Sequence, residues 1–177
     1  MTWYRHADAR YPFLWEDSSQ PPARWHGAGE GPANYFADTP DGAWAEFLRH
    51  EEITELEDLA GVSRAIWAVD VPHPEPKRPT LALNDLIGDE SSYDACRQEA
   101  RTIRLLGEVC LVAPSAALKP RAAAGWTVDK GEYRAAPRDG VVLVMFGQPS
   151  QAVEGWQAAV DARPPVRVLM SVRHLAD

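Results

Sequence analysis

Three residues in the first third of the chain have side chains that suit joint work on one ligand. Arg24, Tyr35 and Glu46 are equally spaced along the sequence. A guanidinium offers forked donors to an anion such as a phosphate. An aromatic ring stacks on a flat group, and a carboxylate stabilises a positive charge that develops during a reaction. Together these types are typical of a site that binds an anionic ligand and stabilises a cation beside it.

Three successive elements are predicted to carry these side chains: a loop, a short strand and a helix. The strand lies around residues 34–36, and the helix runs from a cap at Thr39 to about His50. The Thr39 hydroxyl can accept a free backbone N–H, and Pro40 fits the first helical position. Because Glu46 lies beside the apolar stripe of this helix, we expect it to face a cleft.

Each residue taken alone also has an ordinary structural explanation. A glutamate on a helix is usually solvated, a tyrosine on an aromatic strand usually belongs to the core, and an arginine beside Trp25 can simply stack on it. The three glycines of the turn, Gly27, Gly29 and Gly31, lack the strand–turn–helix context of a dinucleotide-binding loop. The ordered combination, not any single residue, indicates a site.

The remaining elements follow from hydrophobic periodicity. The expected helices cover residues 51–59, 92–106 and 152–162, and the expected strands cover residues 3–5, 63–72, 108–113, 141–146 and 166–172. The run at 141–146 is apolar throughout and suits a central strand, while the run at 166–172 suits a strand nearer an edge. Residues 119–139 are predicted to be a long polar and alanine-rich connection.

Several of these features, taken in order, resemble the RES domain family. The matching positions are Arg24-Trp25, Tyr35, Glu46 and Pro114-Ser115-Ala116. The resemblance is strongest over residues 3–118, and the C-terminal third of the single domain at 1–177 diverges. It implies an α+β fold with a bent mixed sheet, surrounding helices and an NAD-sized cleft, similar to ADP-ribosyltransferases.

The resemblance also implies an activity. Characterised members consume NAD, so the chain is expected to be an enzyme that breaks the nicotinamide–ribose bond by hydrolysis, phosphorolysis or ADP-ribosyl transfer. NAD is then the substrate, and no metal is implied. Members act as toxins paired with an antitoxin of the helix-turn-helix (Xre) type. The alternatives are a catalytically inert RES-like module that binds a nucleotide or a protein, and an interaction module whose motif matches by chance.

Roles for individual residues come from the same resemblance. Glu46 would hold the nicotinamide-ribose hydroxyls and stabilise the cation, Arg24 would bind a phosphate or ribose, and Tyr35 would stack on the nicotinamide or hydrogen-bond to it. The expected substrate-binding residues are Ser115, Trp25, His26 and Arg5. The family usually has Asn where this chain has His26, a bulkier side chain that titrates near neutral pH when unperturbed.

Composition limits the partners. The 177 residues carry a formal charge of −8, which argues against a nucleic-acid backbone as the main partner and is compatible with a basic, DNA-binding antitoxin. Cys96 and Cys110 stand among apolar residues and are expected to be small buried hydrophobes. The histidines show no zinc-ligand spacing. No stretch is apolar enough to span a membrane, so the protein is expected in the cytoplasm. The oligomeric state, including a homo-oligomer, is left open.

Overall fold

A computed structural model describes residues 1–72, 75–128, 130–148 and 153–175, with the backbone alone at 126–128. Within these residues the chain forms a six-stranded sheet in the order β4-β7-β2-β1-β3-β8 and a separate β5-β6 hairpin. The strands are β1 (Thr2–Ala7), β2 (Ala33–Ala37), β3 (Arg64–Asp70), β4 (Cys110–Pro114), β5 (Trp126–Val128), β6 (Glu132–Arg134), β7 (Val141–Phe146) and β8 (Gly155–Ala162). The helices are α1 (Pro40–His50), α2 (Leu83–Ile87), α3 (Tyr93–Leu105) and α4 (Val166–Leu169), with 3-10 turns η1 (Glu57–Gly61) and η2 (Glu90–Ser92).

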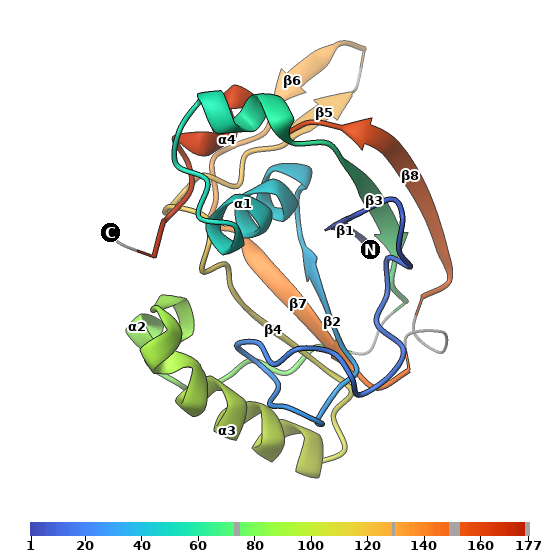
Figure 1. Cartoon of the computed structure of the whole chain (residues 1–177), viewed down its shortest axis with the longest axis vertical. Coiled ribbons are helices and arrows are strands. Elements are labelled where there is room, and N and C mark those ends of the chain that lie inside the picture. The colour runs from blue at the N-terminus through green and yellow to red at the C-terminus, as the bar shows by residue number, and fades with distance from the viewer. Residues whose placement is uncertain (73–74, 129, 149–152, 176–177) are drawn as a thin grey trace.

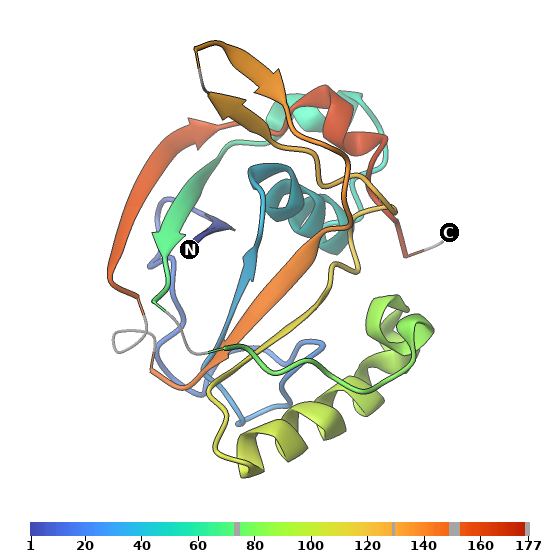
Figure 2. The same ribbon diagram turned by 180° about the vertical axis from the view of Figure 1, so that it is seen from behind.

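The sheet divides into two halves where β1 meets β2. Within the halves, β2 pairs with β7 over five residues and β1 pairs with β3 over six. Between them, β1 and β2 share one register pair, Tyr4 with Ala37. Figures 1 and 2 show β3 and β8 curving away from β2, β7 and β4. The expected bent sheet is therefore confirmed, and the bend lies at a specific strand junction.

The expected α+β fold is confirmed, but the sheet is less mixed than predicted. All pairs between the named strands of the six-stranded sheet are antiparallel. Within the described residues, parallel pairing appears in the isolated bridge of Lys77 with Leu111, beside β4. Here the Lys77 N–H donates to Cys110 O and the Val112 N–H donates to Lys77 O. The segment after β3 thus adds a parallel bridge, not a full parallel strand.

Helix α1 begins and ends where the sequence predicts. The Thr39 hydroxyl accepts the Gly42 N–H at 3.0 Å, and Pro40 is the first helical residue. Its apolar side packs into a core cluster (Trp44, Ala45, Phe47, Leu48, Leu59, Val62, Ala117, Leu118, Ala123, Val168, Val172). The helix lies against β1 and β2, as Figure 1 shows. This packing holds its remaining side at the junction of the two sheet halves.

Helix α3 packs against the half of the sheet that contains β4 and β7. Cys96, Ala100 and Ile103 are buried at helical spacing against Leu111 of β4. The helix is therefore amphipathic, as predicted, with charged residues on its exposed side. Cys96 and Cys110 are both free and buried, which confirms their expected packing role. In both views α3 lies at the end of the molecule opposite the β5–β6 hairpin. This hairpin occupies part of the polar connection predicted at residues 119–139.

Two elements of the C-terminal third were predicted with the wrong type. The expected helix at 152–162 is the strand β8 over Gly155–Ala162, and residue 152 lies outside the described residues. Its backbone pairs with the otherwise open edge of β3, from Arg64 with Ala162 to Asp70 with Gly155. Pairing with a distant strand outweighs the helix preference of the alanines, because local propensity is a weak prior. Most of β8 is exposed, as expected of an edge strand.

The expected strand at 166–172 is instead the short helix α4 (Val166–Leu169) with a following turn. A strand would bury alternate residues, but Val166 is 60% and Met170 78% exposed. Val168 and Val172, four residues apart, are both buried in the cluster around α1. The helical spacing matches the surface that α1 offers. Similarly, residues 51–59 form no continuous helix, and only η1 at Glu57–Gly61 is helical there.

Candidate active site

A pocket of about 350 Å³ opens at the junction of the two sheet halves. Its wall combines β1, β2, α1, the segment before β2, and single residues from α3, from β7, from the end of β4 and from the turn after β4. The residues that line it are Tyr4, Arg5, His6, Trp15, Gln20, Pro21, Pro22, Ala23, Arg24, Trp25, Tyr35, Phe36, Ala37, Ala43, Glu46, Arg49, His50, Tyr93, Pro114, Ala116 and Val142. Five of the seven predicted site residues are among them. Its volume is within the range of small-molecule sites.

Glu46 presents its carboxylate to this pocket from α1. The Ser115 hydroxyl donates to Glu46 Oε1 at 2.9 Å and accepts the Ala117 and Leu118 N–H groups, each at 3.2 Å. Ser115 therefore caps the turn after β4 and holds the carboxylate at once. Burial raises the pKa of Glu46 above its ordinary value, whereas the Ser115 hydrogen bond and the nearby cations Arg49 and Arg24 act in the opposite direction.

Arg24 is buried, and its terminal nitrogens donate to the segment that contains α2 and η2. Nη1 donates to Ser92 Oγ at 2.9 Å and to Asp85 O at 3.3 Å, and Nη2 donates to Gly88 O at 2.6 Å. The guanidinium also lies 4.5 Å from the centre of the Tyr93 ring, which lines the pocket. Arg24 thus joins the segment before β2 to the α2–η2 segment while its charge borders the pocket.

Tyr35 joins strand β2 to the Arg-Trp segment. Its hydroxyl accepts the Trp25 N–H at 3.0 Å and lies 2.9 Å from His26 Nδ1. His26 Nε2 lies 2.9 Å from Pro21 O. Because a carbonyl only accepts, Nε2 carries the proton, so Nδ1 accepts from the Tyr35 hydroxyl. Burial raises the pKa of Tyr35, so its hydroxyl remains protonated.

His26 supports the pocket from behind its wall. The side chain is fully buried and lies outside the set of pocket-lining residues. Burial lowers its pKa below the ordinary value, which keeps the ring neutral at neutral pH and matches the tautomer that the hydrogen bonds require. The expected titration near neutral pH is therefore not what the structure indicates. His26 instead orients Tyr35.

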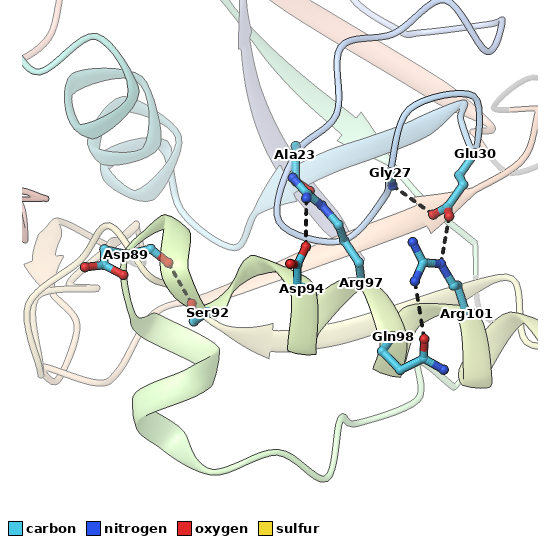
Figure 3. A network of polar contacts seen from close by, with 9 residues as sticks. All are labelled: Ala23, Gly27, Glu30, Asp89, Ser92, Asp94, Arg97, Gln98 and Arg101. Atoms are coloured by element: carbon cyan, nitrogen blue, oxygen red, sulfur yellow. Dashed lines mark hydrogen bonds and ion pairs between the residues drawn. The ribbon is translucent and has the colours of Figure 1, made fainter.

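Helix α3 anchors the segment that carries Arg24, as Figure 3 shows. Arg97 Nε donates to Ala23 O at 2.9 Å. Arg101 Nε pairs with Glu30 Oε1 at 2.7 Å, and Glu30 Oε2 accepts the Gly27 N–H at 2.8 Å. These contacts fix the segment at two points on either side of Trp25 and His26. The glycine-containing turn is therefore held in place by a helix far away in sequence.

Arg5 bridges the two sheet halves from β1. Its Nη1 donates to Tyr35 O at 3.2 Å, across the junction where β1 and β2 separate. Its Nε is buried with no hydrogen-bond partner among the described residues. Burial lowers the pKa of Arg5 to about 10, which still leaves the side chain charged at neutral pH. A half-buried cation at a pocket wall is suited to an anionic ligand.

The pocket is cationic although the chain is acidic. Three arginines, Arg5, Arg24 and Arg49, line it, and Glu46 is the single carboxylate among its lining residues. A concave site with low-dielectric walls strengthens the field of such charges. The arrangement can bind an anion and still present one carboxylate to a cationic centre. Within the described part of the chain, no cluster of three His, Cys, Asp or Glu side chains could hold a metal ion.

Sequence reasoning missed Arg49 and Tyr93. Arg49 follows Glu46 by three residues and therefore shares its side of α1, so this spacing could have identified it. Tyr93 comes from the start of α3, and no local pattern links it to Arg24. Of the predicted residues, Arg5, Arg24, Trp25, Tyr35 and Glu46 line the pocket, Ser115 contacts Glu46, and His26 contacts Tyr35. No helix in the described ranges is long and apolar enough to cross a membrane.

The comparisons with known proteins agree with this architecture. In the solved structures, a chain from "Crystal structure of the M.tuberculosis MbcT-MbcA toxin-antitoxin complex" is similar with a TM-score of 0.61 at 16% identity. The match covers 90% of this chain and 84% of that one. Because the sequence identity is low, the likeness concerns the fold alone. No curated protein sequence matches. The family model of the RES domain matches residues 2–140, and the chain therefore belongs to the RES domain family.

Proposed function

We propose that the protein is an NAD-consuming enzyme that cleaves the bond between nicotinamide and ribose. One observation carries the proposal: the Glu46 carboxylate, held by Ser115, stands alone among three arginines in a single pocket. NAD combines a pyrophosphate, which needs cations, with a ribose carbon that becomes positively charged as nicotinamide leaves. The pocket supplies both complements. Membership of the RES family adds to this support.

The chemistry of this reaction gives the pocket carboxylate a specific role. As the bond from the ribose carbon to the nicotinamide nitrogen breaks, both electrons leave with nicotinamide, which departs neutral. The ribose acquires oxocarbenium character, and a fixed carboxylate stabilises it more than it stabilises the ground state. We assign this role to Glu46. An acceptor (water, phosphate or a protein group) then attacks the same carbon. No strong general acid is needed, because the leaving group carries no negative charge.

The other residues bind and orient. We assign the substrate pyrophosphate to Arg5 and to the field of Arg24, which both line the pocket. Tyr35 and Trp25 also line it, and we assign their rings to contact with the nicotinamide ring. Arg24 has most of its contacts with the α2–η2 segment, so we also assign it the task of holding Tyr93 at the pocket. His26 holds Tyr35.

We further propose that this enzyme is the toxin of a toxin–antitoxin pair that acts in the cytoplasm. The support is the family and the fold shared with a chain of a toxin–antitoxin complex. The proposed partner is a basic helix-turn-helix antitoxin of the Xre type that covers the pocket. A chain with a formal charge of −8 attracts such a partner.

The test is nicotinamide release from NAD by the purified protein, measured with and without phosphate. The matched control is Glu46→Gln, which keeps the size of the side chain and an oxygen that accepts from Ser115. We expect release by the wild type and a loss of about 100-fold or more in the variant, because the fixed charge is gone. Dependence on phosphate would identify the acceptor. NAD binding without release by the wild type would contradict the proposal and favour an inert binding module.

A further inference from the structure

Arg49 occupies an unusual position on α1. It lies three residues after Glu46, so the two side chains share one side of the helix. Its exposed fraction is 6%, although the basic residues of a helix's last turn normally reach solvent. It lines the candidate active site, as Glu46 does. A charge this deeply placed needs a specific set of partners.

Those partners come from three segments that are distant in the sequence. Nη1 donates to Ala116 O, after β4, and to Arg173 O, near the C-terminus, the latter at 3.0 Å. Nη2 donates to Gly88 O, after α2, at 2.7 Å. All three acceptors are backbone carbonyls. A single guanidinium therefore joins the wall of the pocket to the α2–η2 segment and to the C-terminal segment.

Gly88 is the point where two arginines meet. Its carbonyl accepts from Arg49 and also from Arg24, at 2.7 and 2.6 Å. A Cβ at position 88 would lie 2.7 Å from Asn84 O, so the close turn requires glycine. The two cations that act on the Glu46 carboxyl are thus held by one backbone oxygen.

Arg49 also lines a second cavity of about 330 Å³. The remaining residues that line this cavity are Asn84, Ile87, Gly88, Asp89, Arg173, His174 and Leu175. The C-terminal segment is fixed there, because the Arg173 N–H donates to Ala117 O at 2.7 Å. Arg49 therefore belongs to the walls of both cavities.

The charge of Arg49 acts on the catalytic carboxylate. Burial raises the pKa of Glu46, and Arg49 is the first of the two cations that lower it. The second is Arg24, from the facing segment. The other titratable groups that line the pocket are Tyr4, Arg5 and His6 of β1, Tyr35 of β2, His50 of α1 and Tyr93 of α3.

We propose that Arg49 is a positioning residue for Glu46: it supplies a fixed positive charge from the same helix and ties together three backbone segments at the wall of the pocket. This inference rests on the proposed NAD cleavage for its kinetic consequence. Because all its hydrogen bonds go to backbone carbonyls, Arg49 is expected to affect kcat more than KM.

Three variants test the proposal. Arg49→Gln removes the charge, and Arg49→Lys keeps the charge but loses the fork. Arg173→Gln removes a neighbouring charge that also donates to Ala116 O, while it preserves the Arg173 carbonyl that Arg49 uses. The first readout is the titration of Glu46 by ¹³C NMR of labelled glutamate, with the signal assigned by its absence in Glu46→Gln. The second is the dependence of kcat on pH.

We expect the Glu46 titration to move to higher pH in Arg49→Gln and to stay near the wild-type position in Arg49→Lys and Arg173→Gln. The acid limb of kcat should move in the same direction, and kcat at pH 7 should fall at least about tenfold in Arg49→Gln with little change in KM. If Arg49→Gln does not fold, Arg49→Lys still decides: its segments 86–89 and 171–175 should exchange amide hydrogens faster than in the wild type.

An unchanged Glu46 titration in folded Arg49→Gln would overturn the proposal, as would wild-type exchange rates in Arg49→Lys. The NMR and exchange results do not depend on turnover. Absence of nicotinamide release by the wild type would contradict the proposed function, and the titration would then decide the Arg49 proposal separately.

Discussion

Two arginines of the pocket, from different elements, differ in how they are partnered. Arg24, in the segment before β2, donates to Asp85 O, Gly88 O and Ser92 Oγ. Arg5, on β1, has one hydrogen bond within the described residues, to Tyr35 O, and its buried Nε has no partner there. The first arginine is therefore held by several protein groups. The second is held by a single one.

This difference separates two tasks that sequence motifs combine. A buried donor without a partner costs free energy in the absence of ligand, and such a cost is common at functional sites. An arginine with several protein partners instead stabilises the fold and contributes its charge at a distance. The comparison predicts that the two arginines, although both line the pocket, respond to substitution in different ways.

The largest effect is expected from Arg5→Met. Loss of the proposed pyrophosphate contact should lower kcat/KM for NAD by about 100-fold, chiefly through KM. The folded state should lose little stability, because the unpartnered buried donor disappears with the charge. Steady-state kinetics and thermal unfolding measure the two effects. A large loss of stability with normal KM would mean that Arg5 is structural and would break the comparison.

The opposite result is expected from Arg24→Met. The carbonyl of Asp85 and the hydroxyl of Ser92 would lose a donor, whereas the carbonyl of Gly88 keeps Arg49. The loss costs about 1–3 kcal/mol for an unsatisfied group. We expect the free energy of unfolding in urea to fall by about this amount, and the activity of the remaining folded protein to fall through displacement of Tyr93. Unchanged stability would show that Arg24, like Arg5, is held for the ligand.

The smallest effect concerns Glu46, which lines the same pocket. Because its pKa is raised in the folded state, the ionised form opposes folding at neutral pH and the protonated form does not. Glu46→Gln should therefore unfold at a higher temperature than the wild type at pH 7. The difference should disappear as the pH falls to the ordinary pKa of glutamate and below. Equal unfolding temperatures at both pH values would mean that the cations fully compensate burial.

The elements that present Glu46 could be predicted because their signals are local. Thr39 and Pro40 specify where α1 begins, and the hydrogen bond from Gly42 confirms the cap. The short aromatic stretch around Tyr35 predicts β2 in the same way. A cap or a short strand depends on neighbours in the sequence, so its pattern is complete within a few residues.

The C-terminal third could not be predicted because its structure depends on surfaces formed elsewhere. Residues 155–162 become a strand because the edge of β3 is open. Val168 and Val172 adopt helical spacing because the cluster around α1 accepts residues four apart. Amphipathic patterns of this length fit either period, and tertiary contacts decide between them.

The candidate site shows the same division. The motif identified Glu46 and Ser115, and the structure brings them to 2.9 Å. The junction of β1 and β2, which creates the pocket, depends on how two strands diverge and has no signature in either. The partners of Arg49 are three carbonyls from three segments. Neither feature can be found without the fold.

The measurement that tests the account most directly is calorimetric titration of NAD into Glu46→Gln, beside the same protein with Arg5→Met. The first variant should bind NAD at one site per chain, since it keeps the arginines and lacks only the proposed catalytic charge. The additional Arg5 substitution should weaken binding by about 100-fold. No binding by folded Glu46→Gln, or equal binding by both proteins, would contradict the claim that this pocket receives the anionic part of NAD through its β1 wall.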